Sequence, residues 1–164
     1  MRSLGQYPRP DGQLVSAYLV EPEQDSTRPG VVVIQEWWGL DDQIKAVADQ
    51  LAAAGYRALV PDLYRGKLAL EAKEAEHLMG DLNFGEVASQ DIRGAVQHLK
   101  KTGSSAVAVM GFCMGGALTL FALRAGVLEA LRYAEQLRCP FINLLCGTVP
   151  PGGERESLKA LCVG

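Results

Sequence analysis

Long hydrophobic segments are missing from this sequence. Its purely apolar runs are only a few residues long, as in Val31–Ile34, whereas a helix needs about 20 apolar residues to cross a bilayer. The first four residues, Met1–Leu4, lead into Gln-Tyr-Pro-Arg-Pro without the apolar core of an export signal. We therefore expect no membrane partner and a cytoplasmic protein.

An excess of basic residues is also missing. Lys and Arg number 16 against 19 Asp and Glu, which gives a formal net charge of -3. No run of basic residues is longer than Lys100–Lys101. Because nucleic acids and anionic membrane surfaces attract clustered positive charge, the sequence predicts no nucleic-acid partner.

Cysteines are few, and their spacing excludes a zinc site. The chain has 4 of them, and none forms the C-x-x-C pairs that bind zinc. Without an export signal we expect free thiols in a reducing compartment, with no metal and no cofactor. Cys139, Cys146 and Cys162 lie near the end of the sequence, whereas Cys113 stands alone among glycines.

What is present is the composition of one globular domain over residues 1–164. Of these residues, 48% are hydrophobic and 21% are charged, and no repeat or linker divides them. Short apolar segments alternate with segments of helical periodicity. The predicted strands are 14–20, 31–35, 57–60 and 106–110, and the predicted helices are 42–54, 68–79, 86–101 and 117–123.

This alternation predicts an α/β fold, a three-layer sandwich around a mainly parallel sheet. Segment 14–20 alternates only loosely and reads as an edge strand. Segment 31–35 is uniformly apolar, which is typical of a strand buried on both faces. Beyond residue 124 the pattern weakens, and a helix within 127–137 and a strand near 141–145 are expected to cover the sheet edge. An uncovered edge would favour self-association.

The segment around Cys113 has the pattern of a nucleophile elbow. Cys113 lies between Gly111 and Gly115, after a predicted strand and before a predicted helix, which matches G-x-nucleophile-x-G. The helix start favours a thiolate, and the Met114 N–H would be one oxyanion donor. The alternative is that Cys113 is a small buried residue at a tight packing point.

The loop after the uniformly apolar strand contains Glu36, Trp37 and Trp38. An elbow needs a second oxyanion donor from such a loop, and the Trp37 N–H is the candidate. Glu36 is expected to face a cleft, because burying an unpaired carboxylate is costly, although it could be an ordinary solvated acid. The tryptophans could fill the core or wall a substrate pocket, the role we assign to Trp38.

Five segments in order carry a family resemblance: Gln35-Glu-Trp-Trp-Gly-Leu, Pro61-Asp-Leu-Tyr-Arg-Gly, His77-Leu-Met, Gln90-Asp-Ile-Arg-Gly-Ala and Gly111-Phe-Cys-Met-Gly-Gly-Ala-Leu-Thr-Leu. Over about residues 10–123 the chain resembles the dienelactone hydrolase family, of the carboxymethylenebutenolidase type, whereas residues 124–164 diverge. The resemblance implies an α/β-hydrolase fold and a hydrolase that opens lactone or ester bonds through an acyl-thioenzyme.

By the same resemblance, Cys113 is the nucleophile and Glu36 contacts its sulfur. A cationic side chain would hold the carboxylate of the small-molecule substrate, and Lys73 is nearest to that place. Lys73 cannot form the bidentate clamp of an arginine.

The sequence departs from the family after the nucleophile. The family's triad has an Asp and then a His after the cysteine, whereas the last Asp here is Asp91 and the histidines are His77 and His98. The end of the chain is interpreted as a truncation, a frame shift or an alternative end. His98 reads as a boundary residue, and His77, four residues after Lys73, is the other candidate base.

Three functional hypotheses follow. The chain is a hydrolase impaired by the missing Asp and His, a noncatalytic binding or interaction protein, or a thiol-reactive protein whose Cys113 is modified without turnover.

Overall fold

The computed structural model describes residues 1–22 and 28–122. The strands are β1 (Arg2–Pro8), β2 (Leu14–Val20), β3 (Gly30–Ile34), β4 (Arg57–Pro61) and β5 (Val107–Gly111), and the helices are α1 (Asp42–Ala53), α2 (Ala72–Gly80), α3 (Phe84–Glu86), the π-helix η1 (Val87–Ile92) and α4 (Arg93–Lys101). A further helix occupies residues 114–122. The helix expected within 127–137 and the strand expected near 141–145 lie outside the described residues.

The five strands form one sheet in the order β1-β2-β4-β3-β5. β3 pairs in parallel with both β4 and β5, whereas β2 is antiparallel to both β1 and β4. β2 is thus the one strand of this sheet that runs against the other four, and the predicted mainly parallel sheet is confirmed. Within the described part of the chain, β5 pairs with β3 alone.

The expectation that segment 14–20 forms an edge strand is wrong. β2 has the predicted bounds, but β1 pairs along its whole length, from Arg2 opposite Val20 to Pro8 opposite Leu14. β1 was missed because six of its seven residues are not buried, with Tyr7 the exception. A strand exposed in this way lacks the alternating apolar pattern by which strands are found in a sequence.

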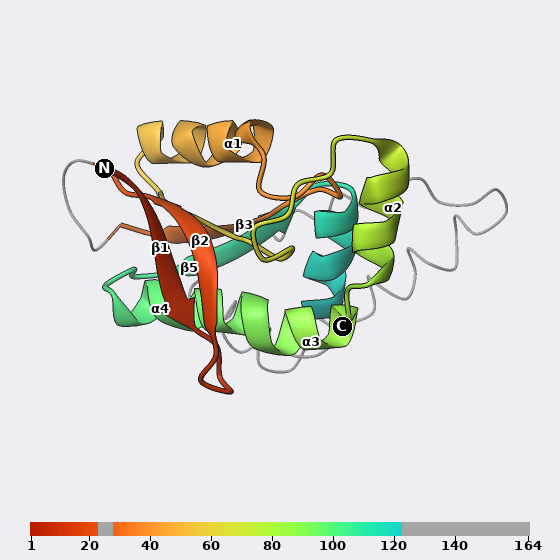
Figure 1. Cartoon of the computed structure of the whole chain (residues 1–164). Helices are drawn as coiled ribbons and strands as arrows, with labels where there is room; N and C mark the ends of the chain where they lie inside the picture. Colours follow the sequence, from red (N-terminus) through yellow and green to blue (C-terminus); the bar gives the residue numbers. More distant parts are fainter. Residues whose placement is uncertain (23–27, 123–164) are drawn as a thin grey trace, which may run out of the picture.

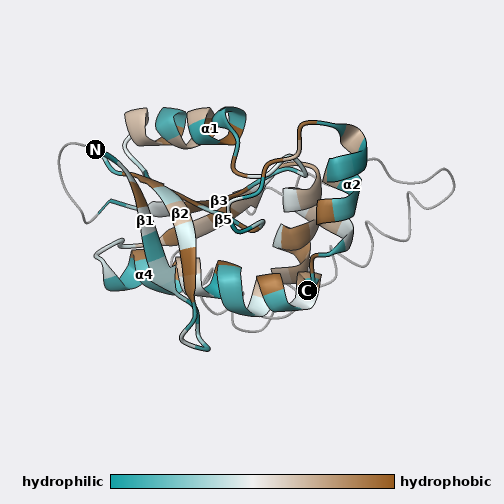
Figure 2. Ribbon diagram, in the orientation of Figure 1, coloured by the Kyte–Doolittle hydropathy of each residue, from teal (hydrophilic) through white to brown (hydrophobic). Residues whose placement is uncertain are grey.

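Helices cover both faces of the sheet (Figure 1). α1 contacts β2, β3 and β4, and α4 contacts β1, β3, β4 and β5. Every residue of β3 and of β4 is buried, as expected for apolar strands between two helical layers. In Figure 2, α1 and α4 carry both hydrophilic and hydrophobic residues, as expected for helices with one face on a core.

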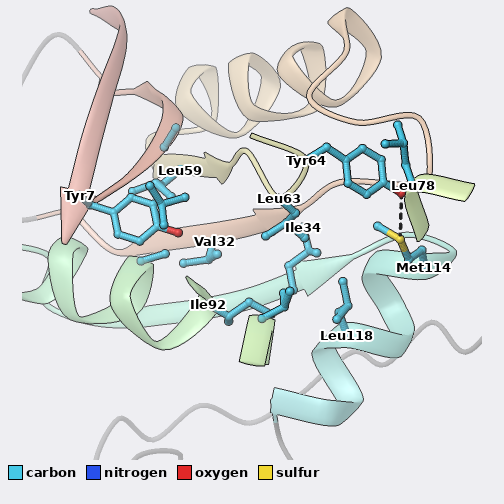
Figure 3. Close-up of a cluster of buried hydrophobic side chains, with 14 of the residues drawn as sticks. Tyr7, Val32, Ile34, Leu59, Leu63, Tyr64, Leu78, Ile92, Met114 and Leu118 are labelled. Atoms are coloured by element: carbon cyan, nitrogen blue, oxygen red, sulfur yellow. Dashed lines mark hydrogen bonds between the residues drawn. The ribbon is translucent and has the colours of Figure 1, made fainter. Parts of the chain in front are cut away.

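The core on the α4 side of the sheet extends toward the helix over residues 114–122 (Figure 3). It includes Tyr7 at one end and Tyr64 and Met114 at the other, all three buried. The core thus links the first strand with the segment that follows β5.

Some helix boundaries follow from local sequence signals and others from contacts with distant segments. The Asp41 side chain caps α1 by accepting a hydrogen bond from the Ile44 N–H at 2.9 Å, which stabilises the helix start. α2 begins at Ala72 and not at Leu68, because Leu68 forms a β-bridge with Gly39. The segment before α2 therefore supports the loop after β3.

The helix predicted over 86–101 is continuous but not uniform. Residues of η1 depart from α-helical geometry, and its Asp91 is only 1% exposed. The Asp91 carboxylate accepts hydrogen bonds from Arg65 at 2.8 and 3.0 Å and from Arg9 at 3.3 Å. Its backbone carbonyl accepts one from the Tyr7 hydroxyl at 2.8 Å. These bonds fasten β1 and the segment after β4 to the helical layer.

At the amino-terminal end of the parallel strands, Arg57 is almost completely buried, at 2% exposure. Its guanidinium donates to Glu21 Oε1 at 2.6 and 3.0 Å, to Ser104 Oγ at 2.9 Å and to Thr102 Oγ1 at 3.0 Å. It also donates to the carbonyls of Leu99 and Thr102 at 3.2 and 3.3 Å. A buried charge with this many partners ties β4 to the end of α4.

None of the helices in the described residues combines the length and the apolarity that a membrane span needs.

Candidate active site

Cys113 lies at a sharp turn between β5 and the helix over residues 114–122. Its φ is +52°, a left-handed backbone conformation that residues other than glycine rarely adopt. The thiol is free and Cys113 is exposed. Strain of this kind costs about 1–3 kcal/mol and persists where the surrounding structure enforces it. The geometry is that of a nucleophile elbow, with an exposed side chain on a strained turn.

The two glycines of the elbow are required by close backbone contacts. A Cβ on Gly111 would lie 2.3 Å from the carbonyl carbon and oxygen of Gly115. A Cβ on Gly115 would lie 2.5 Å from the carbonyl oxygen of Ile34 and 2.7 Å from that of Gln35. The elbow therefore packs directly on the carboxyl end of β3, next to the residue that precedes Glu36.

The start of the helix lies at the thiol. The Cys113 carbonyl accepts hydrogen bonds from the N–H groups of Gly116 and Ala117 at 3.0 and 3.2 Å. Met114 is the first helical residue, so its N–H has no acceptor within the helix. The predicted oxyanion role of the Met114 N–H remains a prediction.

The loop after β3 is a tight turn over residues 36–39. The Gly39 N–H approaches the Glu36 carbonyl at 3.5 Å, and the Ala69 N–H donates to the Trp38 carbonyl at 2.9 Å. The rings of Trp37 and Trp38 are half-buried and meet edge to face, with centroids 5.2 Å apart. Both tryptophans also pack against the core, which favours the core-filling alternative for at least part of each ring.

The carboxylate of Glu36 is half-buried, and within residues 1–22 and 28–122 it has no hydrogen-bond or ion-pair partner. Two buried polar atoms near it also lack partners among these residues, Nε2 of Gln35 and Oδ1 of Asp62. Gln35 and Asp62 follow β3 and β4 directly. Polar groups at the carboxyl end of the sheet thus lack a complete set of hydrogen-bond partners among the described residues.

Lys73 is exposed in the first turn of α2, whereas the same helix buries Ala75 and Leu78. The structure joins it neither to Cys113 nor to Glu36 through any contact in the described part of the chain. Its role in holding a substrate carboxylate therefore remains a prediction.

The two histidines lie in different surroundings. His77 is exposed on α2, with its Nε2 3.6 Å from Asp81 Oδ2. His98 is half-buried on α4 against the Tyr7 ring, with ring centroids 6.1 Å apart. Burial, and then the charge of Arg57, lowers the pKa of His98. Arg57 marks the amino-terminal end of the strands, so His98 lies at the end of the sheet opposite to Cys113.

Tyr64 lies near the site, although no role for it was expected from the sequence. Its hydroxyl donates to the Trp37 carbonyl at 3.1 Å and lies 3.4 Å from the Met114 sulfur (Figure 3). The sequence placed Tyr64 in a family-like segment after the strand 57–60, but only the fold shows which residues it joins.

The described residues hold no group of three or more His, Cys, Asp or Glu side chains able to bind a metal ion.

Comparison with known proteins identifies the family. The family model described as "Dienelactone hydrolase family" matches residues 15–133, a span that contains both Glu36 and Cys113. The chain belongs to the dienelactone hydrolase family. The resemblance expected from the sequence is thereby confirmed.

Similarity to individual known proteins agrees with this assignment. The chain is 36% identical over 119 residues to "Protein usf" of Aquifex pyrophilus, covering 68% of this chain and 51% of that protein. It is 31% identical over 118 residues to Carboxymethylenebutenolidase 1 of Cupriavidus pinatubonensis, covering 65% and 50%. The solved structure "m3DLH" has a TM-score of 0.65 at 29% identity, covering 77% and 55%.

These matches support the expected α/β-hydrolase fold, and the chain spans about half the length of the curated relatives it matches.

Proposed function

We propose that this chain reacts with ester or lactone bonds through Cys113, as the nucleophile of a dienelactone hydrolase-type hydrolase. The observation that carries the proposal is the exposed thiol at φ +52° on an elbow packed against the end of β3. A thiolate in this position can reach an acyl carbon without moving the backbone.

In the first step, the Cys113 sulfur attacks the acyl carbon and forms a tetrahedral intermediate with a negative oxygen. The N–H groups of Trp37 and Met114 are the proposed donors to this oxygen. The intermediate then collapses, the C–O bond to the leaving oxygen breaks, and an acyl-thioenzyme remains. With a lactone, the leaving alkoxide stays attached to the acyl group as the opened ring.

Glu36 is the proposed neighbour of the sulfur. Gly115 touches the Gln35 carbonyl, so the next residue along the chain lies close to the elbow. A carboxylate beside the sulfur would repel the negative charge of an attacking sulfur. Glu36 is thus proposed to limit reaction of the free thiol.

The second step is hydrolysis of the acyl-thioenzyme, which needs an activated water molecule. General-base assistance contributes about 10²–10⁴-fold to such steps. The sequence contains no Asp or His after Cys113, and the His98 ring lies at the far end of the sheet. For this chain we therefore propose that acylation is faster than deacylation.

The substrate is proposed to be a small ester or lactone. Trp38 is half-buried beside the turn that follows β3, where an aromatic wall would contact the acyl group. Lys73 is proposed to attract a substrate carboxylate by charge alone, because its ammonium lacks the fork of a guanidinium.

The test is a single-turnover reaction with 4-nitrophenyl acetate, followed by mass spectrometry of the intact protein. We expect a burst of 4-nitrophenolate equal to the protein concentration, an acetyl group on Cys113, and little steady turnover. Cys113→Ala should abolish both the burst and the adduct, and His77→Ala should leave them unchanged.

Slow release of acetate from the adduct would favour the impaired hydrolase, and a persistent adduct would favour the thiol-reactive protein. Sustained turnover lost in His77→Ala would show that His77 is the base and that deacylation is not impaired. No adduct would favour a noncatalytic binding protein. A burst that survives in Cys113→Ala would contradict the nucleophile assignment.

A further inference from the structure

We propose that Tyr64 is a positioning residue that fixes the two proposed oxyanion donors relative to each other; this inference rests on the proposed function. Its hydroxyl contacts exactly the two residues whose N–H groups are assigned to the oxyanion, at 3.1 Å to the Trp37 carbonyl and 3.4 Å to Met114 Sδ. Trp37 lies in the turn after β3 and Met114 at the start of the helix over residues 114–122, so the two residues are far apart in the sequence.

The direct hydrogen bond acts on the turn over residues 36–39. Tyr64 donates to the carbonyl of Trp37, which fixes the plane of the peptide between Trp37 and Trp38. The Trp37 N–H is on the preceding peptide, whose orientation rests on the long Glu36–Gly39 contact of 3.5 Å. Because that contact is at the limit of a hydrogen bond, the bond from Tyr64 is the stronger of these two restraints on Trp37.

The sulfur contact acts on the helix start. Met114 is buried, at 4% exposure, and its sulfur lies against the Tyr64 hydroxyl. One hydroxyl proton serves one acceptor at a time, and a carbonyl oxygen is a stronger acceptor than a thioether. The proton therefore goes to Trp37, and Met114 is held by packing against the same ring (Figure 3).

Tyr64 is suited to be a permanent donor. Burial raises its pKa to about 12, so the hydroxyl keeps its proton at neutral pH. Tyr64 itself is fixed from the other side of the site, because Leu63 N–H donates to Gln35 Oε1 at 3.2 Å. The segment after β4 is thus bonded to the residues on both sides of Glu36, Gln35 and Trp37.

The test compares two reactions of the same sulfur. Acetylation by 4-nitrophenyl acetate passes through an oxyanion, whereas alkylation by iodoacetamide does not. Both rate constants are measured for the full chain and for Tyr64→Phe, which removes one oxygen atom. We expect acetylation of Cys113 to slow about tenfold, less than the 10²–10³-fold seen when a donor is removed, and alkylation to stay unchanged.

Tyr7→Phe is the matched control. It also deletes a buried hydroxyl, which donates to the Asp91 carbonyl at 2.8 Å, but at the far end of the core (Figure 3). It should lower stability without changing the ratio of the two rates. If Tyr64→Phe does not fold, all variants are compared with trimethylamine N-oxide, which stabilises the folded state.

An equal fall of both rates would overturn the inference, because it would show a general loss of the elbow. An unchanged ratio in Tyr64→Phe would overturn it as well. These outcomes differ from failure of the proposed function, in which the unmodified chain shows no Cys113-dependent acetylation at all.

Discussion

The two ends of the parallel strands are built in opposite ways. At the amino-terminal end, Arg57 is 2% exposed and its guanidinium makes six hydrogen bonds to its neighbours. At the carboxyl end, Cys113 is held at φ +52°, and Gln35 Nε2 and Asp62 Oδ1 are buried without partners among the described residues. One end is satisfied and unstrained, whereas the other is strained and incompletely paired.

Stability and reactivity thus depend on opposite ends of β3, β4 and β5, each of which is five residues long. Strain and unpaired polar groups persist only where the rest of the fold is stable enough to enforce them. The Arg57 cluster and the buried strands supply that stability. The carboxyl end can therefore maintain an exposed thiol on a strained turn, next to the proposed backbone donors.

The largest effect is expected from breaking the satisfied end. Arg57→Ala should lower the free energy of unfolding by about 3 kcal/mol, because it removes bonds to Glu21, Ser104 and buried carbonyls. Urea denaturation measures the loss. Arg57→Lys keeps the charge but not the fork, so it should lose less. Alkylation of Cys113 in the folded protein should not change, and a changed rate would show that the two ends are coupled.

Breaking the strained end should have a smaller effect on stability and a larger one on chemistry. Gly115→Ala forces a Cβ to within 2.5 Å of the Ile34 carbonyl, and the resulting shift should cost about 2 kcal/mol. It should also slow acetylation of Cys113. Gly80→Ala is the control, since nothing lies within 4 Å of its added Cβ. Equal stability of the two variants would contradict the packing of the elbow on β3.

Relieving the strain should sharpen the contrast. Cys113→Gly should be more stable than Cys113→Ala by about 1 kcal/mol, because only glycine adopts the left-handed conformation without a steric penalty. Thermal and urea denaturation of the two variants compare them directly. Both lack the thiol, so the difference reports backbone strain alone. A less stable glycine variant would show that Cys113 is not strained in solution.

The charge at the strained end should have a modest effect. Glu36→Gln should speed alkylation of Cys113 by iodoacetamide about threefold near neutral pH, because the proposed neighbour would no longer repel the negative charge of the attacking sulfur. Glu76→Gln, on the exposed side of α2, is the control and should have no effect. Cys113 should also react before Cys139, Cys146 and Cys162. Equal labelling of all four cysteines would remove the site assignment.

The smallest effect concerns pH at the satisfied end. Burial lowers the pKa of His98, so the unfolded chain binds the proton more readily than the folded one. The contribution of His98 to the free energy of unfolding is present above its pKa in the unfolded chain, about 6.5, and is lost as the pH falls through its lower pKa in the folded protein. His98→Gln should reduce the drop in urea midpoint between neutral and mildly acidic pH. His77→Gln, at an exposed position, should not.

Patterns confined to one segment were predicted well. The apolar run 31–35 fell within one residue of β3, and 14–20 matched β2. The glycines around Cys113 predicted a sharp strand-to-helix turn, and the left-handed φ of Cys113 agrees. These features follow from spacing and residue size, which neighbouring residues determine among themselves.

Features that depend on distant partners could not be predicted. β1 exists as a strand because β2 offers it a complete partner, although its own pattern is polar. Tyr64 meets Trp37 and Met114 only once three loops converge. The position of His98 at the end opposite to Cys113 likewise depends on how α4 packs on the sheet.

The sequence by itself determined the order of strands and helices from β2 onward, the family and the elbow around Cys113, because hydrophobic period and glycine spacing are local properties of the chain. The tertiary structure decided which strand forms the edge, where Arg57 finds its partners and how Tyr64 joins two loops. The contacts of Arg57 and Tyr64 connect residues 27 to 50 positions apart, and only the packing of helices on the sheet brings such residues within hydrogen-bond distance.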